Sequence, residues 1–212
     1  MTTAHDLFLT ALDVPATHPL TQGDLSLALA GAELVDLLGA EAVHLDAGDR
    51  DGDGDGDGDR IVPGLQPTTG DRLLDEAAAA LRREHPYESV DDWLWRRGRG
   101  LAAAYARETR AESGPHGHRW LPTRARHAPP PDSPERRHAA DRWAFREPVL
   151  VAVAAALGIP EGGVRQEDTA RDLDDAVLTV VAAVHNALTE LAAVRQRRRI
   201  EDDAYANIWR GA

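Results

Sequence analysis

Pro67-Thr-Thr-Gly-Asp-Arg-Leu-Leu-Asp-Glu-Ala77 is the stretch that decides the fold of this 212-residue chain. It reads as a turn that opens a helix, which we expect to run to about Glu84. Thr69 or Asp71 can accept hydrogen bonds from the exposed amides of the first turn, and Asp75 suits the positive end of the helix dipole. These acids are therefore expected at a helix start rather than in a catalytic pair.

The apolar pattern on both sides of this stretch is also helical. Hydrophobic residues make up 42% of the chain and aromatic residues only 5%, and a core rich in Ala, Leu and Val favours close-packed helices. The sequence predicts a mainly α fold in a single domain, residues 1–212. The further expected elements are a short apolar element over 6–13 and helices over 25–38, 89–105, 135–145, 147–157 and 172–199. Gly98 and Gly100 weaken the third of these segments, which can form two helices.

Two details concern how these helices pack. Gly31, in the helix over 25–38, would let another helix approach closely. The helix Asp172 to Arg199 is apolar on most sides, which indicates a central, largely buried helix. His185 is expected in the core, and the arginines at 195 and 197–199 are expected to suit the negative C-terminal end of this helix.

Two short strands are expected at Ala42 to Leu45 and at Arg60 to Val62. Between them, residues 51–59 alternate Asp and Gly, a low-complexity loop with nothing to bury. This loop begins like a calcium-binding EF-hand loop, but Val62 stands where the bidentate Glu is required. We therefore expect a hairpin and no metal site.

The composition also bears on the compartment. The chain has no Cys, which excludes disulfides and thiolate sites. The segment Met1 to Thr10 does not read as a secretory signal, and Val149 to Leu157, the most apolar stretch, is too short to span a bilayer. We expect a cytoplasmic protein whose membrane contact would be peripheral.

The net charge of −12 is unevenly spread. Residues 1–92 hold 20 acidic and 5 basic residues, whereas residues 93–146 hold 5 acidic and 12 basic residues. A basic segment in an acidic protein can face an anionic membrane lipid or a phosphate, although the same arginines can also be spread over solvated helix faces. The overall charge and the lack of a reader motif argue against nucleic acid. Every basic residue is Arg, which favours a bacterial source.

Nothing in the sequence specifies a reaction. His116 and His118 lie in a loop without a second ligand pair, and the sequence has no Gly-x-Ser-x-Gly, His-Glu-x-x-His or Walker pattern. We expect a protein that is not an enzyme and needs no cofactor.

At residues 67–77 the chain resembles the Golgi phosphoprotein 3 family, which carries a Pro-Thr-Gly-Asp turn followed by Leu-Leu-Asp-Glu-Ala. Three further segments agree in order, and they are 6–13, 29–37 and 174–191. The resemblance implies a helical bundle core ringed by amphipathic helices, with short β-hairpins. It also implies a peripheral membrane adaptor that binds phosphatidylinositol 4-phosphate and recruits protein partners.

The resemblance places the family's four head-group residues near Thr21, Ala30, Arg99 and Ala102, so at most Arg99 is kept. We predict a head-group or anion site at Arg96, Arg97 and Arg99. A phosphate pocket needs several convergent donors. The alternative is therefore a protein-interaction module of the same fold without lipid binding.

The family's protruding hairpin, which supports membrane insertion and self-association, maps near residues 119–132. Here Arg119, Trp120, Leu121 and Arg124 are the predicted membrane or partner contacts. Trp120 beside these arginines can anchor at a membrane interface, or it can fold back onto the core.

Overall fold

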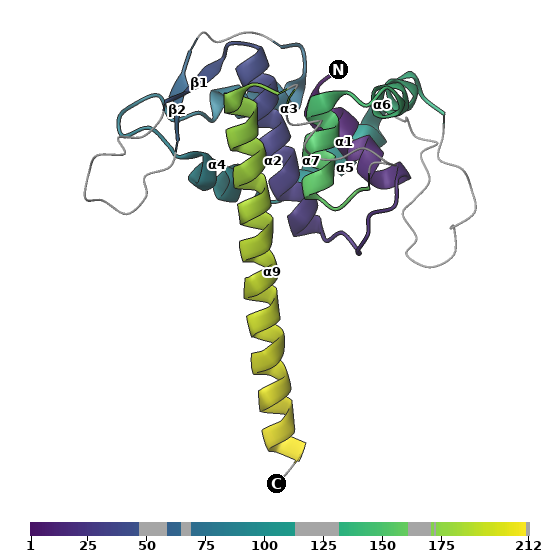
Figure 1. Cartoon of the computed structure of the whole chain (residues 1–212), viewed down its shortest axis with the longest axis vertical. Coiled ribbons are helices and arrows are strands. Elements are labelled where there is room, and N and C mark those ends of the chain that lie inside the picture. The colour runs from purple at the N-terminus through teal and green to yellow at the C-terminus, as the bar shows by residue number, and fades with distance from the viewer. Residues whose placement is uncertain (47–58, 65–68, 113–131, 161–170, 172, 211–212) are drawn as a thin grey trace.

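A computed structural model describes residues 1–46, 59–64, 69–112, 132–160, 171 and 173–210, with the side chains of 206–210 excepted. These residues form eight helices and one two-stranded antiparallel hairpin, which confirms the mainly α prediction. The hairpin and α4 lie on one side of the central helices α2 and α9, whereas α1, α6 and α7 lie on the other side, and α3 crosses behind the pair (Figure 1). The Asp/Gly segment over 51–58 and the predicted contacts Arg119, Trp120, Leu121 and Arg124 lie outside the described residues.

The central helix is α2, Gln22–Gly39. Thr21 caps it through a reciprocal box with Asp24, in which each side chain accepts from the other residue's backbone N–H. Most of its residues are buried, because helices pack on several of its faces. It lies where the sequence predicted the helix over 25–38, although it begins three residues earlier.

The hairpin pairs β1, Val43–Asp46, with β2, Arg60–Pro63. Both strands agree with the predicted ranges to within a residue. Val43 and Ile61 are buried and join the core. The hairpin therefore closes one end of the helical body.

The segment that opened the sequence argument forms α3, Arg72–Ala79. Asp71 caps it by accepting from the Leu74 N–H at 3.0 Å, as predicted. The predicted extension to Glu84 is wrong. The carbonyl of Ala80 accepts from Arg96 Nη2 at 3.2 Å instead, so the chain can turn there and bury Leu81.

The predicted helix over 89–105 is two helices, α4, Val90–Arg97, and α5, Leu101–Glu112. Ser89 caps α4 by accepting from the Asp92 N–H at 3.1 Å, as its pattern indicated. Gly100, with a φ of 72°, lies in the turn between the helices, where the left-handed backbone favours glycine.

The opposite side of the body contains α1, Thr3–Asp13, α6, Pro134–Ala144, and α7, Pro148–Ala156. The carboxylate of Asp36 on α2 accepts from the first two amides of α1, at 2.9 and 3.0 Å. Arg142 on α6 bridges buried Asp6 on α1, at 2.6 Å, and Glu147 at the start of α7, at 2.8 Å. Charged side chains thus fix how these three helices meet.

Helix α9, Asp175–Arg210, corrects two predictions. The helix is not largely buried, because only one stripe, Val177, Val180, Val184 and Ala187, is buried. His185 is exposed rather than in the core. On its other sides Leu188 and Leu191 are only partly buried against the core, and Ala193 is exposed, so pattern alone overstated the burial.

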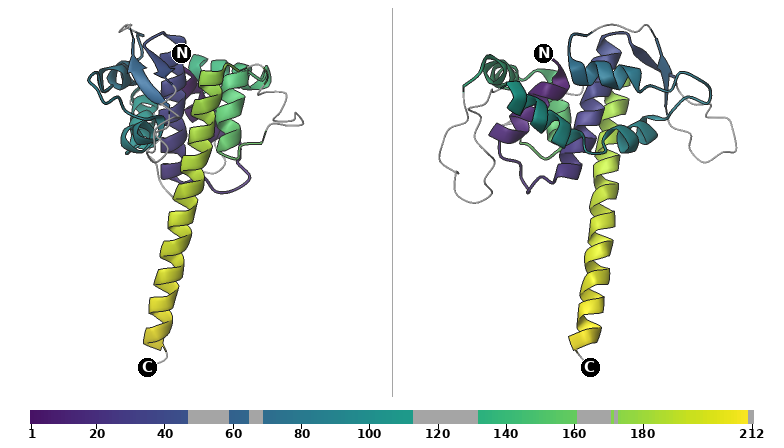
Figure 2. Two further views of the ribbon diagram at one scale, coloured as in Figure 1. Left: turned by 60° about the vertical axis from the view of Figure 1, so that its left-hand side comes forward. Right: turned by 180° about the vertical axis from the view of Figure 1, so that it is seen from behind.

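The same helix also runs past Arg199 and projects well beyond the body in every view (Figures 1 and 2). The arginines expected at its C-terminal end therefore lie within it. By length and composition, a window of α9 passes as a membrane span. Only 28% of that window is buried in the body.

The close approach of α2 and α9 at Gly31 gives a first prediction. A Cβ at this position would lie 2.3 Å from Val184 Cγ2, so Gly31→Ala forces the helices apart. We expect a loss of about 1–3 kcal/mol in the free energy of unfolding, measured by urea denaturation.

Gly39→Ala is the matched control on the same helix. A Cβ there would meet nothing within 4 Å, and Ala is the better helix former by up to about 1 kcal/mol. Equal losses in the two variants would show that the α2–α9 approach is not tight.

Candidate functional site

Arg97 lies in a buried ion pair. Its Nε and Nη2 donate to the two carboxylate oxygens of Glu33 on α2, at 2.7 and 2.9 Å. Nη2 also donates to the carbonyl of Leu73 at 2.9 Å, and the Tyr105 hydroxyl donates to Glu33 at 3.1 Å. The Glu33 side chain has no exposed area. Arg97 therefore joins α2, α3 and α4, and its guanidinium faces the interior.

Burial is the largest influence on the pKa values of the two acidic groups in this network, Glu33 and Tyr105. Desolvation raises the pKa of Glu33 to about 7, although the hydrogen bonds and charge of Arg97 act in the opposite direction. Desolvation also raises the pKa of the Tyr105 hydroxyl, and the nearby Glu33 charge adds to that shift. Burial lowers the pKa of Arg97, but its bonds to Glu33 outweigh that effect and raise it. Arg97 therefore stays charged.

Arg96 is paired as well. Its Nε and Nη2 each donate to Glu88 at 2.6 Å, and its guanidinium lies 5.2 Å from the centre of the Trp93 ring. The bonds to Glu88 raise the pKa of Arg96. Glu88 is buried, so this pair fixes the loop after α3 against α4.

Arg99 differs from its two neighbours. It is exposed, and within the described residues it has no carboxylate partner. It lines a hollow of about 310 Å³ between the start of α2, the α4–α5 turn and α9. The other side chains of this hollow include Gln22, Ser26, Trp95 and Leu191. An anion that entered it would meet Arg99 and the positive end of α2.

The other positions given by the family resemblance lie close by, but offer little. Thr21 is the α2 cap, and its hydroxyl already accepts from Arg195 Nη2 at 2.5 Å. Ala30 and Ala102 are buried and carry no polar side chain. The structure therefore brings Thr21 and Arg99 to the same end of α2, while Arg96 and Arg97 point into internal pairs. Anion binding by the three predicted arginines stays a prediction.

A larger groove of about 820 Å³ lies on the other flank of α9. Its apolar lining includes Leu157 and Leu188, and its rim includes Arg195, Arg198 and Arg199. Arg195 is held by Asp24, at 2.5 Å, and by the Thr21 hydroxyl. Sequence reasoning missed this groove, because nothing local links α9 with the start of α2.

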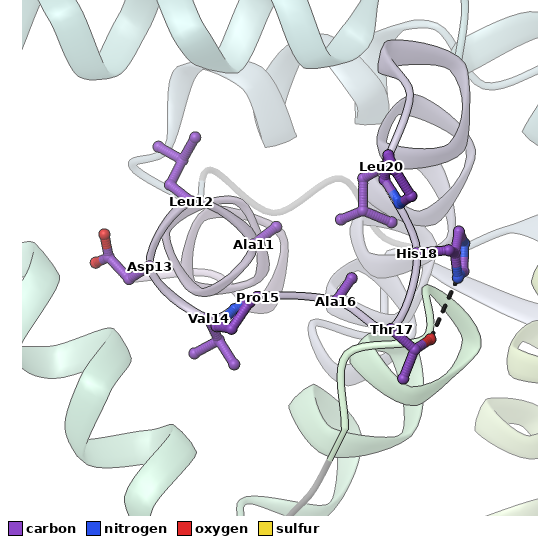
Figure 3. A pocket seen from close by; sticks show the side chains of 10 residues that line it. Ala11, Leu12, Asp13, Val14, Pro15, Ala16, Thr17, His18 and Leu20 are labelled. Carbon is purple, nitrogen blue, oxygen red and sulfur yellow. Dashed lines mark hydrogen bonds between the residues drawn. The ribbon is translucent and has the colours of Figure 1, made fainter. Parts of the chain in front are cut away.

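A third hollow, of about 500 Å³, is lined by the loop that joins α1 to α2 (Figure 3). Thr17 Oγ1 and His18 Nδ1 lie 3.3 Å apart in it. The Asp13 and His18 side chains point in different directions, so no charged groups converge there (Figure 3). Across the part of the chain that the structure describes, no three His, Asp or Glu side chains gather as metal ligands.

Two acidic partners were also missed by sequence reasoning. Glu33 and Glu88 neutralise the arginines that were predicted to bind an anion. Glu33 carried a signal, because an acid within the apolar run of α2 requires a partner once that helix is buried. The partner itself, 64 residues away, could not be chosen among the other arginines.

The fold and the hollow at Arg99 define a mainly helical protein with an open, partly basic site at one end of its central helix. The family model described as Golgi phosphoprotein 3 (GPP34) matches residues 4–208. The chain therefore belongs to the Golgi phosphoprotein 3 family, whose members are non-catalytic adaptors and peripheral membrane proteins that bind phosphatidylinositol 4-phosphate. Among curated proteins, no significant match to the chain was found.

The Glu33–Arg97 pair gives a second prediction. Above pH 7, where Glu33 is mostly ionised, Glu33→Ala leaves the mostly buried Arg97 without a counter-charge, and we expect it to cost about 3–5 kcal/mol in the free energy of unfolding. Arg137→Ala is the control, because its pair with Asp132 is mostly exposed and contributes about 1 kcal/mol or less. Similar losses in both variants, measured by urea denaturation, would contradict a structural role for the buried pair.

The raised pKa of Glu33 gives a third prediction. The folded state holds this proton up to about pH 7, whereas the carboxyl of the unfolded chain releases it near the ordinary glutamate value of 4.5. The stability due to Glu33 is therefore present below pH 4.5 and is lost as the pH rises towards 7. We expect the stability of the wild type relative to Glu33→Gln to fall across this window. A pH-independent difference in parallel urea titrations would contradict the raised pKa.

Proposed function

We propose that this protein is a non-catalytic adaptor that associates peripherally with anionic membrane lipid through the hollow at Arg99. The observation that carries the proposal is the exposed Arg99, which has no carboxylate partner among the described residues and lies beside Trp95 and the start of α2. The family resemblance places two of its four head-group positions, Thr21 and Arg99, at that end of α2. A lipid phosphate can accept from the guanidinium, while the indole offers an amphipathic surface.

The chemistry of the hollow favours weak and broad recognition. One arginine supplies one fork of donors, whereas tight binding of a phosphorylated head group needs several convergent donors. We therefore propose that the lipid site distinguishes anionic from neutral membranes more strongly than one phosphoinositide from another. The segment with Arg119, Trp120, Leu121 and Arg124 is proposed as a second membrane or partner contact.

The proposal also covers compartment, partners and source. An adaptor of this kind works on the cytoplasmic side of a membrane and brings protein partners to it. Its Arg-only basic composition supports a bacterial source. The absence of a recognisable catalytic pattern in the sequence supports a role without chemistry.

A second candidate function is a protein-interaction module of the same fold that does not bind lipid. The internal pairing of Arg96 and Arg97 favours it, because two of the three predicted arginines already have carboxylate partners. The two functions differ in their response to vesicles.

Vesicle flotation at low salt gives the fourth prediction. We expect the protein to float with vesicles that contain phosphatidylserine or phosphatidylinositol 4-phosphate, and not with phosphatidylcholine alone. Arg99→Glu should weaken this binding about tenfold or more, because it replaces an attraction with a repulsion near the surface.

Arg83→Glu is the matched control, with the same change of charge at an exposed position of the body outside the hollow. No flotation of the wild type at low salt would leave the interaction module as the function. Equal weakening in both variants would mean that net charge, rather than the hollow, governs the contact.

A further inference from the structure

The part of α9 beyond the body has an unusual charge order. Three arginines, Arg197 to Arg199, stand before Ile200, and three acids, Glu201 to Asp203, follow it. All seven side chains are exposed, and Ile200 is 59% exposed. The sign of the charge therefore changes at Ile200. For each arginine before Ile200, an acid stands at the same number of residues after it.

These six charged side chains have no ion-pair partner among the residues that the structure describes, and Arg199 donates only to Gln196, at 2.8 Å. An Arg four residues before an acid is also the less favourable order on a helix. These charges therefore favour a partner along this segment.

We propose that two copies of this chain pair through their α9 segments, antiparallel, about a two-fold axis at Ile200. In such a pair the same surface of α9 from both copies forms the contact. A residue on the N-terminal side of Ile200 in one copy therefore meets a residue on the C-terminal side of Ile200 in the other. The inverted charge order is then complementary to its own copy. The inference is independent of the proposed lipid contact, which uses other residues.

Helix geometry decides which charges meet. At about 100° per residue, Arg197 and Glu201 lie on one flank of Ile200, and Arg199 and Asp203 lie on the other. The two-fold axis brings each flank against the same flank of the second copy. Arg197 then faces Glu201 of the partner subunit, and Arg199 faces Asp203 of the partner subunit. The two Ile200 side chains cover each other at the axis.

A parallel pair would be less favourable. It would bring Arg197 beside Arg199 of the partner subunit, and Glu201 beside Asp203 of the partner subunit. Such like-charge neighbours disfavour that orientation, as they do at the flanks of coiled coils.

The body does not obstruct the antiparallel pair. The buried stripe of α9, which includes Val184 and Ala187, faces the body, where α2, α4 and α7 pack against this helix. By helix geometry Ile200 points to nearly the opposite side, along the exposed residues Thr189 and Ala193. The second α9 would therefore lie along the face away from the body. The contact is small, so the association is expected to be weak, at about 10–100 µM, and sensitive to salt.

Charge exchange tests the proposal. One double variant, Arg197→Glu with Arg199→Glu, makes both flanks acidic, and another, Glu201→Arg with Asp203→Arg, makes both basic. We expect sedimentation at low salt, up to several times that concentration, to show dimers of the wild type. Each variant alone should associate at least about tenfold more weakly. An equimolar mixture of the two variants should recover dimers, because their flanks are then complementary.

Arg82→Glu with Arg83→Glu is the control, with the same change of charge on exposed residues of the body. A monomeric wild type at all concentrations, or no recovery in the mixture, would overturn the proposal. Circular dichroism of each variant separates a lost dimer from an unfolded tail.

Cross-linking tests the orientation, since the chain has no Cys of its own. Ile200→Cys should form a disulfide-linked dimer on mild oxidation, because the two residues meet at the axis. Ala193→Cys lies on the same face but about 20 Å from its own copy in an antiparallel pair, so it should remain unlinked. Efficient linkage at both positions would indicate a parallel pair and overturn the antiparallel one.

Discussion

The structure depends on the burial of one carboxylate, Glu33, within the central helix. An acid without exposed area on α2 requires a partner of opposite charge, and Arg97 supplies it through two hydrogen bonds. The same guanidinium donates to the backbone carbonyl of Leu73 on α3, and the Tyr105 hydroxyl closes the network from α5. The placement of three helices around α2 therefore follows from a single ionic requirement.

That requirement changes how the basic middle of the chain is understood. The excess of arginine over residues 93–146 suggested an electropositive face, but Arg96, Arg97 and Arg142 are directed at carboxylates inside the fold. Much of the positive charge in this segment offsets the acidic charge of the first 92 residues. Part of the basic segment thus joins elements of the fold, and Arg99 is an arginine of this segment that stays exposed near the start of α2.

Helix caps, which join residues close in the sequence, were predictable from the sequence. Ion pairs between residues far apart in the sequence were not. Asp71 and Ser89 act as caps within three residues of their partners, so their roles followed from order alone. Gly31 indicated a close helix approach but could not name Val184 as the contact. The candidate site was found in part, because the resemblance led to Arg99, whereas the engagement of Arg96 and Arg97 depends on distant acids. The exposure of α9 escaped prediction because an apolar pattern does not say how many of its sides other helices cover.

The fork of Arg97 has a consequence for which substitutions the chain can accept. Its planar guanidinium satisfies two carboxylate oxygens and a backbone carbonyl together, and Arg142 and Arg96 likewise each bridge two acceptors on different segments. An ammonium group would keep the charge but could not span these acceptors in one plane. In a protein without a single lysine, cohesion therefore rests on the shape of the cation as much as on its charge.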